Sequence, residues 1–209
     1  MNPASYLDAL FAPEDPALLA MREAADRSGL PPTAIAPGTG RLLQVLLESV
    51  GARRVLEVGT LGGYSATWLA RALPAEGGRL TTVEIEPRFA EFARRQLAYA
   101  GVGERVDVVV GRALDVLPAY DGERFDAIFL DADAEPLPTY FDWAVRLLRP
   151  GGLLLSDNAL RGGRVLDPRA DDAATTAVRE FHRRLATDPR VSATIVPTPD
   201  GLVVARVRG

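Results

Sequence analysis

The sequence predicts an α/β fold built on a doubly wound, mostly parallel sheet that ends in an antiparallel strand. From residue 53 onward, short β-branched runs alternate with longer helical patterns. Several strand candidates, such as 127–130 and 153–156, are apolar throughout, as expected for parallel strands covered on both faces. The last two strand candidates are joined only by the turn sequence 198–201, so the final strand must run antiparallel to the one before it.

The hydrophobic pattern predicts a helix or a strand for each segment of the chain. The first fifty residues are expected to be helical, with helices over 15–28 and 39–50 and a stop at Gly51. The strands are expected at 54–58, 80–84, 106–110, 127–130, 153–156, 193–197 and 202–207. The helices between them are expected at 63–73, 87–100, 112–119, 136–148 and 173–187.

Length and composition bound the class of protein. The 209 residues contain no low-complexity linker, which favours one domain with an N-terminal helical part (1–52) and an α/β core (53–209). The chain has no apolar run of the ~20 residues that a membrane span needs and no basic segment leading into an apolar stretch, so we expect a cytoplasmic protein with no membrane partner. A net charge of −4 argues against nucleic-acid binding, and the absence of cysteine excludes thiolate chemistry.

The basic residues are unusual because all 24 are arginine. A chain without lysine has no Schiff-base lysine, no lysine general base and no P-loop lysine.

A glycine-rich turn follows the first strand. Gly59, Gly62 and Gly63 would let the backbone approach a ligand closely, and the following helix would point its amides at it. The spacing does not match the dinucleotide pattern G-x-G-x-x-G, and Glu57 suits a ligand with a positive amino group better than a pyrophosphate. A tight turn that binds no ligand is the alternative.

Acidic residues end three further strands. Glu84 is placed to accept hydrogen bonds from the two hydroxyls of a ribose, although it or Glu86 could instead cap the next helix. Asp131, Asp157 and Asn158 offer only oxygen ligands, which suit a hard cation such as Mg²⁺, with Ca²⁺ or Mn²⁺ as substitutes. The alternative for the last two is a simple Asx turn.

Four segments together resemble the cation-dependent O-methyltransferases that use S-adenosylmethionine (SAM), the group of catechol and caffeoyl-CoA O-methyltransferases. These segments are VLEVGTLGGYS (55–65), VEIEP (83–87), FLDAD (129–133) and LLRPGGLLLSDN (147–158). The resemblance implies a class I methyltransferase fold, which is Rossmann-like, over nearly the whole chain. It also implies a small hydroxylated acceptor, catechol-like or phenolic, and a homodimer formed through the N-terminal helices.

The same resemblance implies roles for individual residues. Asp131 is the expected catalytic residue, acting together with the metal. The expected cofactor contacts are Ile35, Glu57, Gly59, Thr60, Ser65, Glu84, Ala113 and Asp131. The expected metal ligands are Asp131, Asp157 and Asn158.

The chain departs from the family pattern at two places. Ala134 stands where the family usually has the lysine taken to be the general base. Three explanations of the missing lysine are open. The metal alone could acidify the phenol, or the acceptor could be more acidic than a simple catechol. Alternatively, the chain could be a SAM-binding protein with weak or no methyl transfer. Arg161 stands where many relatives have tryptophan, and the hypothesis is that Arg161 or Arg164 contacts an anionic part of the acceptor; two solvated loop arginines are the alternative.

Overall fold

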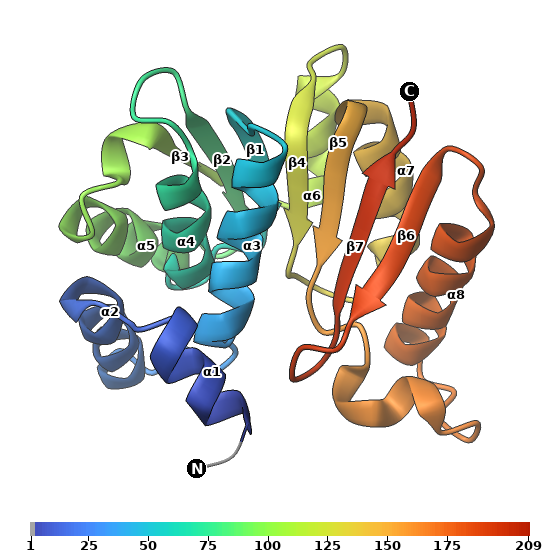
Figure 1. The fold of residues 1–209 in the computed structure, drawn as a ribbon, viewed down its shortest axis with the longest axis horizontal. Coiled ribbons are helices and arrows are strands. Elements are labelled where there is room, and N and C mark those ends of the chain that lie inside the picture. The colour runs from blue at the N-terminus through green and yellow to red at the C-terminus, as the bar shows by residue number, and fades with distance from the viewer. Residues whose placement is uncertain (1–2) are drawn as a thin grey trace. The chain divides into compact units, whose positions relative to one another are not determined.

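Strands and helices alternate along the chain in the computed structural model, which describes residues 3–209 (Figure 1). The chain divides into two compact units, Met1–Ala113 and Leu114–Gly209. The single domain expected over 1–209 stays a prediction.

The first unit is built on three parallel strands in the order β3-β2-β1. They are β1 (Arg54–Val58), β2 (Arg79–Glu84) and β3 (Val106–Val110). The register places Glu57 opposite Thr82, and Glu84 opposite Val110. The acidic residues of β1 and β2 therefore lie near the carboxyl ends of neighbouring parallel strands, as the sequence predicts.

Helices cover the strands of the first unit. They are α1 (Pro3–Phe11), α2 (Pro16–Arg27), α3 (Pro37–Ser49), α4 (Tyr64–Ala72) and α5 (Pro87–Tyr99), with a short 3₁₀ turn η1 (Gly103–Arg105). Helix α5 packs on β2 and β3, α4 packs on β2, and α3 and α2 pack on α4. A proline in the first turn starts α2, α3 and α5, because the missing N–H of proline is not needed there.

The second unit holds four strands in the order β4-β5-β7-β6. They are β4 (Phe125–Leu130), β5 (Leu148–Ser156), β6 (Val191–Val196) and β7 (Leu202–Val207). Strands β4 and β5 are parallel, and β7 runs antiparallel to both of its neighbours, β5 and β6. The predicted antiparallel final strand is confirmed.

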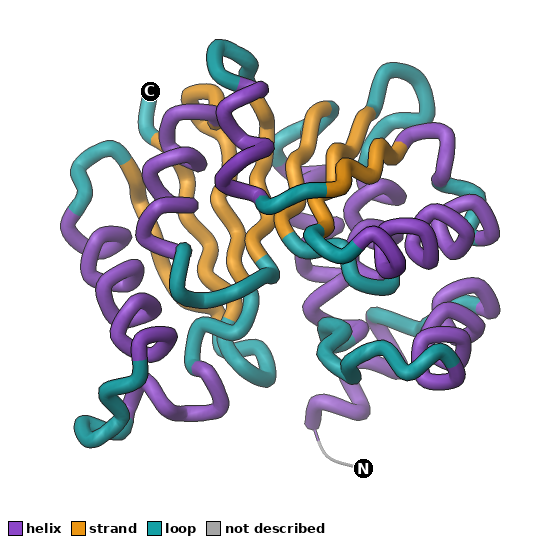
Figure 2. The backbone as a smooth tube through the Cα atoms, turned by 180° about the vertical axis from the view of Figure 1, so that it is seen from behind, coloured by secondary structure: helices purple, strands orange, loops and turns teal. Residues whose placement is uncertain are grey.

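The helices of the second unit are α7 (Leu137–Leu147) and α8 (Ala173–Thr187), with the 3₁₀ segments η2 (Leu117–Tyr120) and η3 (Arg161–Leu166). Helix α7 packs on β4 and β5, and α8 packs on α7 and β6, as Figure 2 shows from behind. The rings of Phe141 and Phe181 meet edge to face between α7 and α8, 6.1 Å apart, and both side chains are almost fully buried.

Two expectations need correction. The helix expected over 112–119 is α6 (Ala113–Val116) followed by the separate 3₁₀ segment η2, since Pro118 cannot donate the hydrogen bond that would continue an α-helix. Residues 161–166, expected as loop, contain the short 3₁₀ turns of η3, and these turns are interrupted by a kink at Gly162 and Gly163, whose φ angles of 59° and 86° are not helical. Among the described residues, no helix is long and apolar enough to cross a membrane.

Candidate functional site

The glycine turn after β1 has the conformation that its sequence requires. Gly59 and Gly63 have φ angles of 98° and 81°, in the left-handed region that favours glycine. Gly63 is also the N-cap of α4, and its amide donates to the carbonyl of Thr60 at 2.8 Å. Leu61 lies in the same region with φ 45°, a strained conformation for a side chain of this size.

Glu84 holds this turn in place. Its Oε2 atom accepts hydrogen bonds from the amides of Thr60 at 3.2 Å and Leu61 at 2.8 Å, and its Oε1 atom accepts from the amide of Glu86 at 2.9 Å. Glu86 is the N-cap of α5 but makes no side-chain capping bond. Two of the turn amides expected to face a ligand are therefore used by the protein itself, and they fix the position of the Glu84 carboxylate.

Glu57 is fully buried at the end of β1. The Thr82 hydroxyl donates to its Oε2 atom at 2.6 Å, and the hydroxyls of Thr82 and Thr60 lie 2.6 Å apart. Sequence reasoning missed Thr82, although a polar residue in the middle of a buried strand was the available signal. The row of hydroxyls links the Glu57 carboxylate to the glycine turn.

The remaining expected cofactor contacts of the first unit, Ile35, Ser65 and Ala113, are all buried. The carbonyl of Ile35 accepts a hydrogen bond from the guanidinium of Arg22 at 3.0 Å. Arg22 in turn donates to Glu14 at 2.6 Å and lies over the Tyr64 ring, 4.1 Å from its centre.

Tyr64, the first residue of α4, completes this network. Its hydroxyl donates to the same Glu14 oxygen at 2.7 Å. Burial raises the pKa of Tyr64 to about 12, so the phenol stays protonated and remains a donor at neutral pH. Glu14, Arg22 and Tyr64 thus tie the end of the glycine turn to the segment that carries Ile35, and none of the three was singled out from the sequence.

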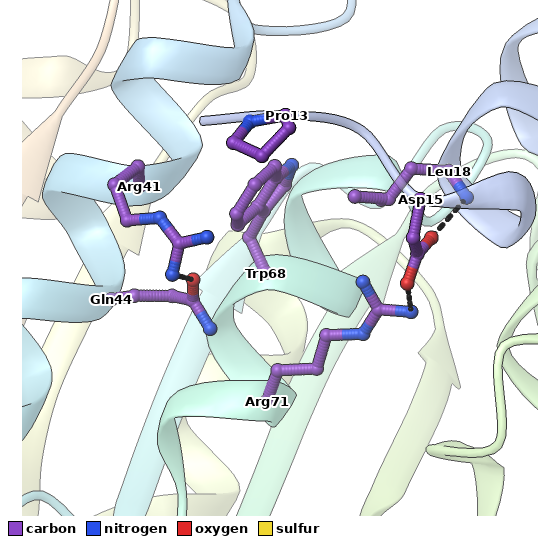
Figure 3. Close-up of a pocket in the computed structure, with 7 residues that line it drawn as sticks. All are labelled: Pro13, Asp15, Leu18, Arg41, Gln44, Trp68 and Arg71. Atoms are coloured by element: carbon purple, nitrogen blue, oxygen red, sulfur yellow. Dashed lines mark hydrogen bonds and ion pairs between the residues drawn. The ribbon is translucent and has the colours of Figure 1, made fainter. Parts of the chain in front are cut away.

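A groove of about 410 Å³ lies on the first unit (Figure 3). It is lined by Pro13, Asp15, Leu18, Arg41, Gln44, Trp68 and Arg71. Its two arginines are already engaged, Arg71 with Asp15 at 2.8 Å and Arg41 with Gln44 at 2.9 Å. No expected site residue lines this groove, so it is distinct from the expected cofactor contacts.

In the second unit, the parallel pairing of β4 and β5 brings the predicted metal ligands together. Leu130 pairs with Ser156, so Asp131 and Asp157 follow neighbouring strand ends. The amide of Asp157 donates to the carbonyl of Leu130 at 3.2 Å, and Asn158 Nδ2 donates to Asp131 Oδ1 at 3.0 Å. Asn158 has a φ angle of 57°, which asparagine tolerates better than most residues.

The electrostatics of this cluster suit a cation. Burial, with the nearby charge of Asp157, raises the pKa of Asp131 to about 7. Burial also raises the pKa of Asp157, and the charge of Asp200 adds to the effect. A bound cation would offset both the desolvation and the repulsion.

The donor set is small but chemically consistent. Within residues 3–209 there is no group of three or more His, Cys, Asp or Glu side chains placed to hold a metal. The cluster has two carboxylates and one amide, and all three residues carry oxygen atoms of the kind that Mg²⁺ and Ca²⁺ prefer, with water able to complete the shell. These residues therefore fit a hard divalent cation.

Comparison with known proteins identifies the family. The family profile described as O-methyltransferase matches residues 9–208. The chain belongs to the O-methyltransferase family. A catechol O-methyltransferase from Mycobacterium tuberculosis is 43% identical, over 98% of this chain and 94% of the relative.

Solved structures support the same assignment. One is the O-methyltransferase TomG from Streptomyces achromogenes, which is involved in tomaymycin synthesis and was solved in complex with SAM. It has a TM-score of 0.92 and 44% sequence identity, and the match covers 99% of this chain and 96% of TomG. An O-methyltransferase from Bacillus cereus in complex with SAH, the demethylated cofactor, has a TM-score of 0.93 and 39% identity, with 98% and 96% covered.

These likenesses confirm the predicted class I methyltransferase fold, which is Rossmann-like. This O-methyltransferase is a SAM-dependent enzyme of a family that acts on small molecules. The family assignment agrees with the mismatch between the glycine turn and the dinucleotide pattern G-x-G-x-x-G.

Proposed function

We propose that this O-methyltransferase moves the methyl group of SAM to a hydroxyl of a catechol-like or phenolic small molecule, with the help of a divalent cation, most simply Mg²⁺. The observation that carries the proposal is the cluster of Asp131, Asp157 and Asn158 after β4 and β5, whose burial and mutual repulsion favour a cation. The name of the M. tuberculosis relative supports a catechol as the acceptor.

The proposed cofactor contacts in the first unit are Ile35, Glu57, Gly59, Thr60, Ser65, Glu84 and Ala113. In this proposal the fixed carboxylate of Glu84 accepts hydrogen bonds from the ribose, and Glu57 supplies negative charge near the amino group of the methionine part. The bonds that Thr82 and the turn amides make to these two carboxylates support it, since they hold both acceptors in place before any ligand binds.

The proposed metal ligands are Asp131, Asp157 and Asn158, and Asp131 is also proposed as the catalytic residue and as a cofactor contact. A cation bound there would hold the acceptor oxygens and lower the pKa of the hydroxyl to be methylated. Ala134 supplies no base, while its exposed neighbours Asp133 and Glu135 can pass the released proton to solvent. Methyl transfer then depends on positioning and on the charge of the acceptor oxygen.

The decisive experiment measures SAH release from catechol in Mg²⁺ and in excess chelator. We expect activity to require the metal and to fall by at least 10²-fold in Asp131→Asn and Asp157→Asn, because metal-assisted ionisation is a large part of the rate. The control is Asp171→Asn, an exposed aspartate outside the cluster, which should keep full activity.

A second readout does not depend on turnover. Mg²⁺ should raise the thermal midpoint of the wild-type protein but not that of Asp131→Asn, because a ligand that binds only the folded state stabilises it. Equal activity with Mg²⁺ and with chelator would refute the metal dependence while leaving SAM-dependent transfer intact.

We also propose that the protein is a homodimer formed through its N-terminal helices. Helix α1 supports this, since Tyr6, Leu7, Leu10 and Phe11 are each more than half exposed. Contiguous apolar surface of this kind is typical of protein interfaces.

A further inference from the structure

The segment between β5 and α8, orange in Figure 1, carries two arginines in η3 with different surroundings. Arg164 is more than half exposed, and its Nη2 atom donates to Asp172 Oδ2 at 2.6 Å. Its charge is matched within the loop, so Arg164 needs no ligand.

Asp172 already accepts hydrogen bonds from three donors other than Arg161. As the N-cap of α8, it accepts from the Thr175 amide at 2.9 Å and from the Thr175 hydroxyl at 2.7 Å, in addition to the bond from Arg164. The nearest guanidinium nitrogen of Arg161 lies 3.7 Å from Asp172 Oδ1, a long ion pair that is beyond hydrogen-bonding distance.

The Arg161 guanidinium is thus left without a hydrogen-bond acceptor in the part of the chain that the structure describes. Its side chain is only 27% exposed, and its Nε atom is buried with no partner. Buried donors on charged groups are nearly always bonded, and an exception calls for a ligand or another explanation.

The backbone places Arg161 one turn away from the proposed metal ligands. The Arg161 amide donates to the carbonyl of Asn158 at 3.2 Å, and the Asn158 side chain bonds to Asp131. The turn is anchored to the hairpin before β7, since the amides of Leu160 and Gly162 donate to the carbonyl and the carboxylate of Asp200, at 2.8 and 2.7 Å. The φ angle of 48° at Arg161 is therefore maintained by bonds on both sides.

We infer that Arg161 recognises a carboxylate on the methyl acceptor, so that the preferred acceptor is a catechol-like acid rather than a neutral catechol. A guanidinium donates two parallel hydrogen bonds to a carboxylate, and a partly buried one binds it more strongly than an exposed one. This inference rests on the proposed function, because it assumes that Asp131, Asp157 and Asn158 hold the reacting hydroxyl.

The test compares 3,4-dihydroxybenzoate with 3,4-dihydroxybenzamide, a neutral analogue of nearly the same shape, in SAM and Mg²⁺. For the wild type we expect a KM lower for the acid by on the order of ten- to a hundredfold, the range for a charge-assisted hydrogen bond. Arg161→Ala should bring the two KM values together by raising only that of the acid. Arg161→Lys should restore part of the difference. The matched control is Arg169→Ala, because Arg169 is an exposed loop arginine that pairs with Asp167 and not with Asp172, and this variant should leave the difference unchanged.

A binding measurement separates failure of this inference from failure of the proposed function. The protein saturated with SAH and Mg²⁺ is titrated calorimetrically with 3,4-dihydroxybenzoate, so no turnover is needed. If neither compound is methylated, the proposed function fails, and loss of acid binding in Arg161→Ala would then support only the binding of a carboxylate by Arg161. If the wild type shows no preference for the acid, or Arg161→Ala keeps it, or the acid does not bind, the inference is wrong.

Discussion

At the scale of single residues, the buried carboxylate of Glu57 supports its proposed place beside the amino group of SAM. Removing a charge from water costs several kcal/mol unless other groups replace its hydration. Here the Thr82 hydroxyl supplies one short hydrogen bond, and Thr60 lies within hydrogen-bonding distance of Thr82. Because burying a carboxylate lowers the stability of the fold, a fully buried glutamate is more often explained by function than by stability.

Ala134 is the residue at which this enzyme differs most sharply from the pattern that its sequence resembles. It lies in the short segment between β4 and α7, three residues after Asp131, and its carbonyl accepts from the Leu137 amide at 3.1 Å. The side chain is partly exposed, so a longer one can be accommodated.

We predict that Ala134→Lys increases the turnover of simple catechols at neutral pH. A positioned general base contributes 10²- to 10⁴-fold to a rate, and a newly introduced one should give a smaller gain of about tenfold. The measurement is the initial rate of SAH release from catechol in Mg²⁺. Ala134→Met, which has a long side chain but no amine, is the control, and the same gain in that variant would mean that packing, not base catalysis, was responsible.

At the scale of secondary-structure elements, a polar network connects α2, α4 and the segment before α3. Arg22 on α2 bonds to Glu14 and to the carbonyl of Ile35, while Tyr64 at the start of α4 bonds to Glu14. Because α4 begins where the glycine turn ends, this network sets the position of both the turn and Ile35. In the proposed cofactor site, this network would let an N-terminal helix influence SAM binding.

We predict that Arg22→Met weakens SAM binding about tenfold, whereas Tyr64→Phe has a smaller effect. The first variant releases the Ile35 carbonyl and breaks the bond to Glu14, while the second removes one hydrogen bond, worth ~1 kcal/mol, and leaves Arg22 bonded to Ile35. Calorimetric titration with SAM gives the affinities, and thermal unfolding gives the stabilities. If both variants lose stability but bind SAM with unchanged affinity, the network contributes to folding and not to SAM binding.

At the scale of the whole molecule, the open question is assembly. The exposed apolar residues of α1 form a run on one helix, while other exposed apolar residues, such as Leu166, lie in a different unit of the chain. The proposed homodimer therefore makes a prediction about α1 in particular.

We predict that the wild type is a dimer by light scattering coupled to gel filtration and that the double variant Leu7→Glu, Leu10→Glu is a monomer. Two buried, unpaired carboxylates would be too costly for the interface. Leu166→Glu, a change at a still more exposed leucine outside α1, should leave the dimer intact. A wild-type monomer, or a double variant that still dimerises, would exclude an interface through α1.

Much of this molecule could be predicted from the sequence because the relevant signals are local. Runs of apolar residues marked parallel strands, the turn at 198–201 required an antiparallel last strand, and strand ends located Glu84, Asp131 and Asp157. Each of these signals depends on hydrophobic periodicity or turn chemistry within a few residues. The helical stretch over 112–119 was predicted correctly in position, but it divides into α6 and the 3₁₀ segment η2, because Pro118 cannot donate the hydrogen bond of a continuous α-helix.

What only the tertiary structure decided is which polar groups meet. Three contacts join residues from different elements. Glu84 accepts from the turn amides, Thr82 donates to Glu57, and Asp172 is hydrogen-bonded to Arg164 but not to Arg161. These contacts depend on the parallel pairing of strands that are distant in the sequence and on the packing of loops. Because hydrogen bonds form only at short range, they cannot be assigned before that packing is known. The sequence by itself therefore determined the fold class and the kinds of residue at the site, and the tertiary structure determined which of their donors and acceptors remain for a ligand.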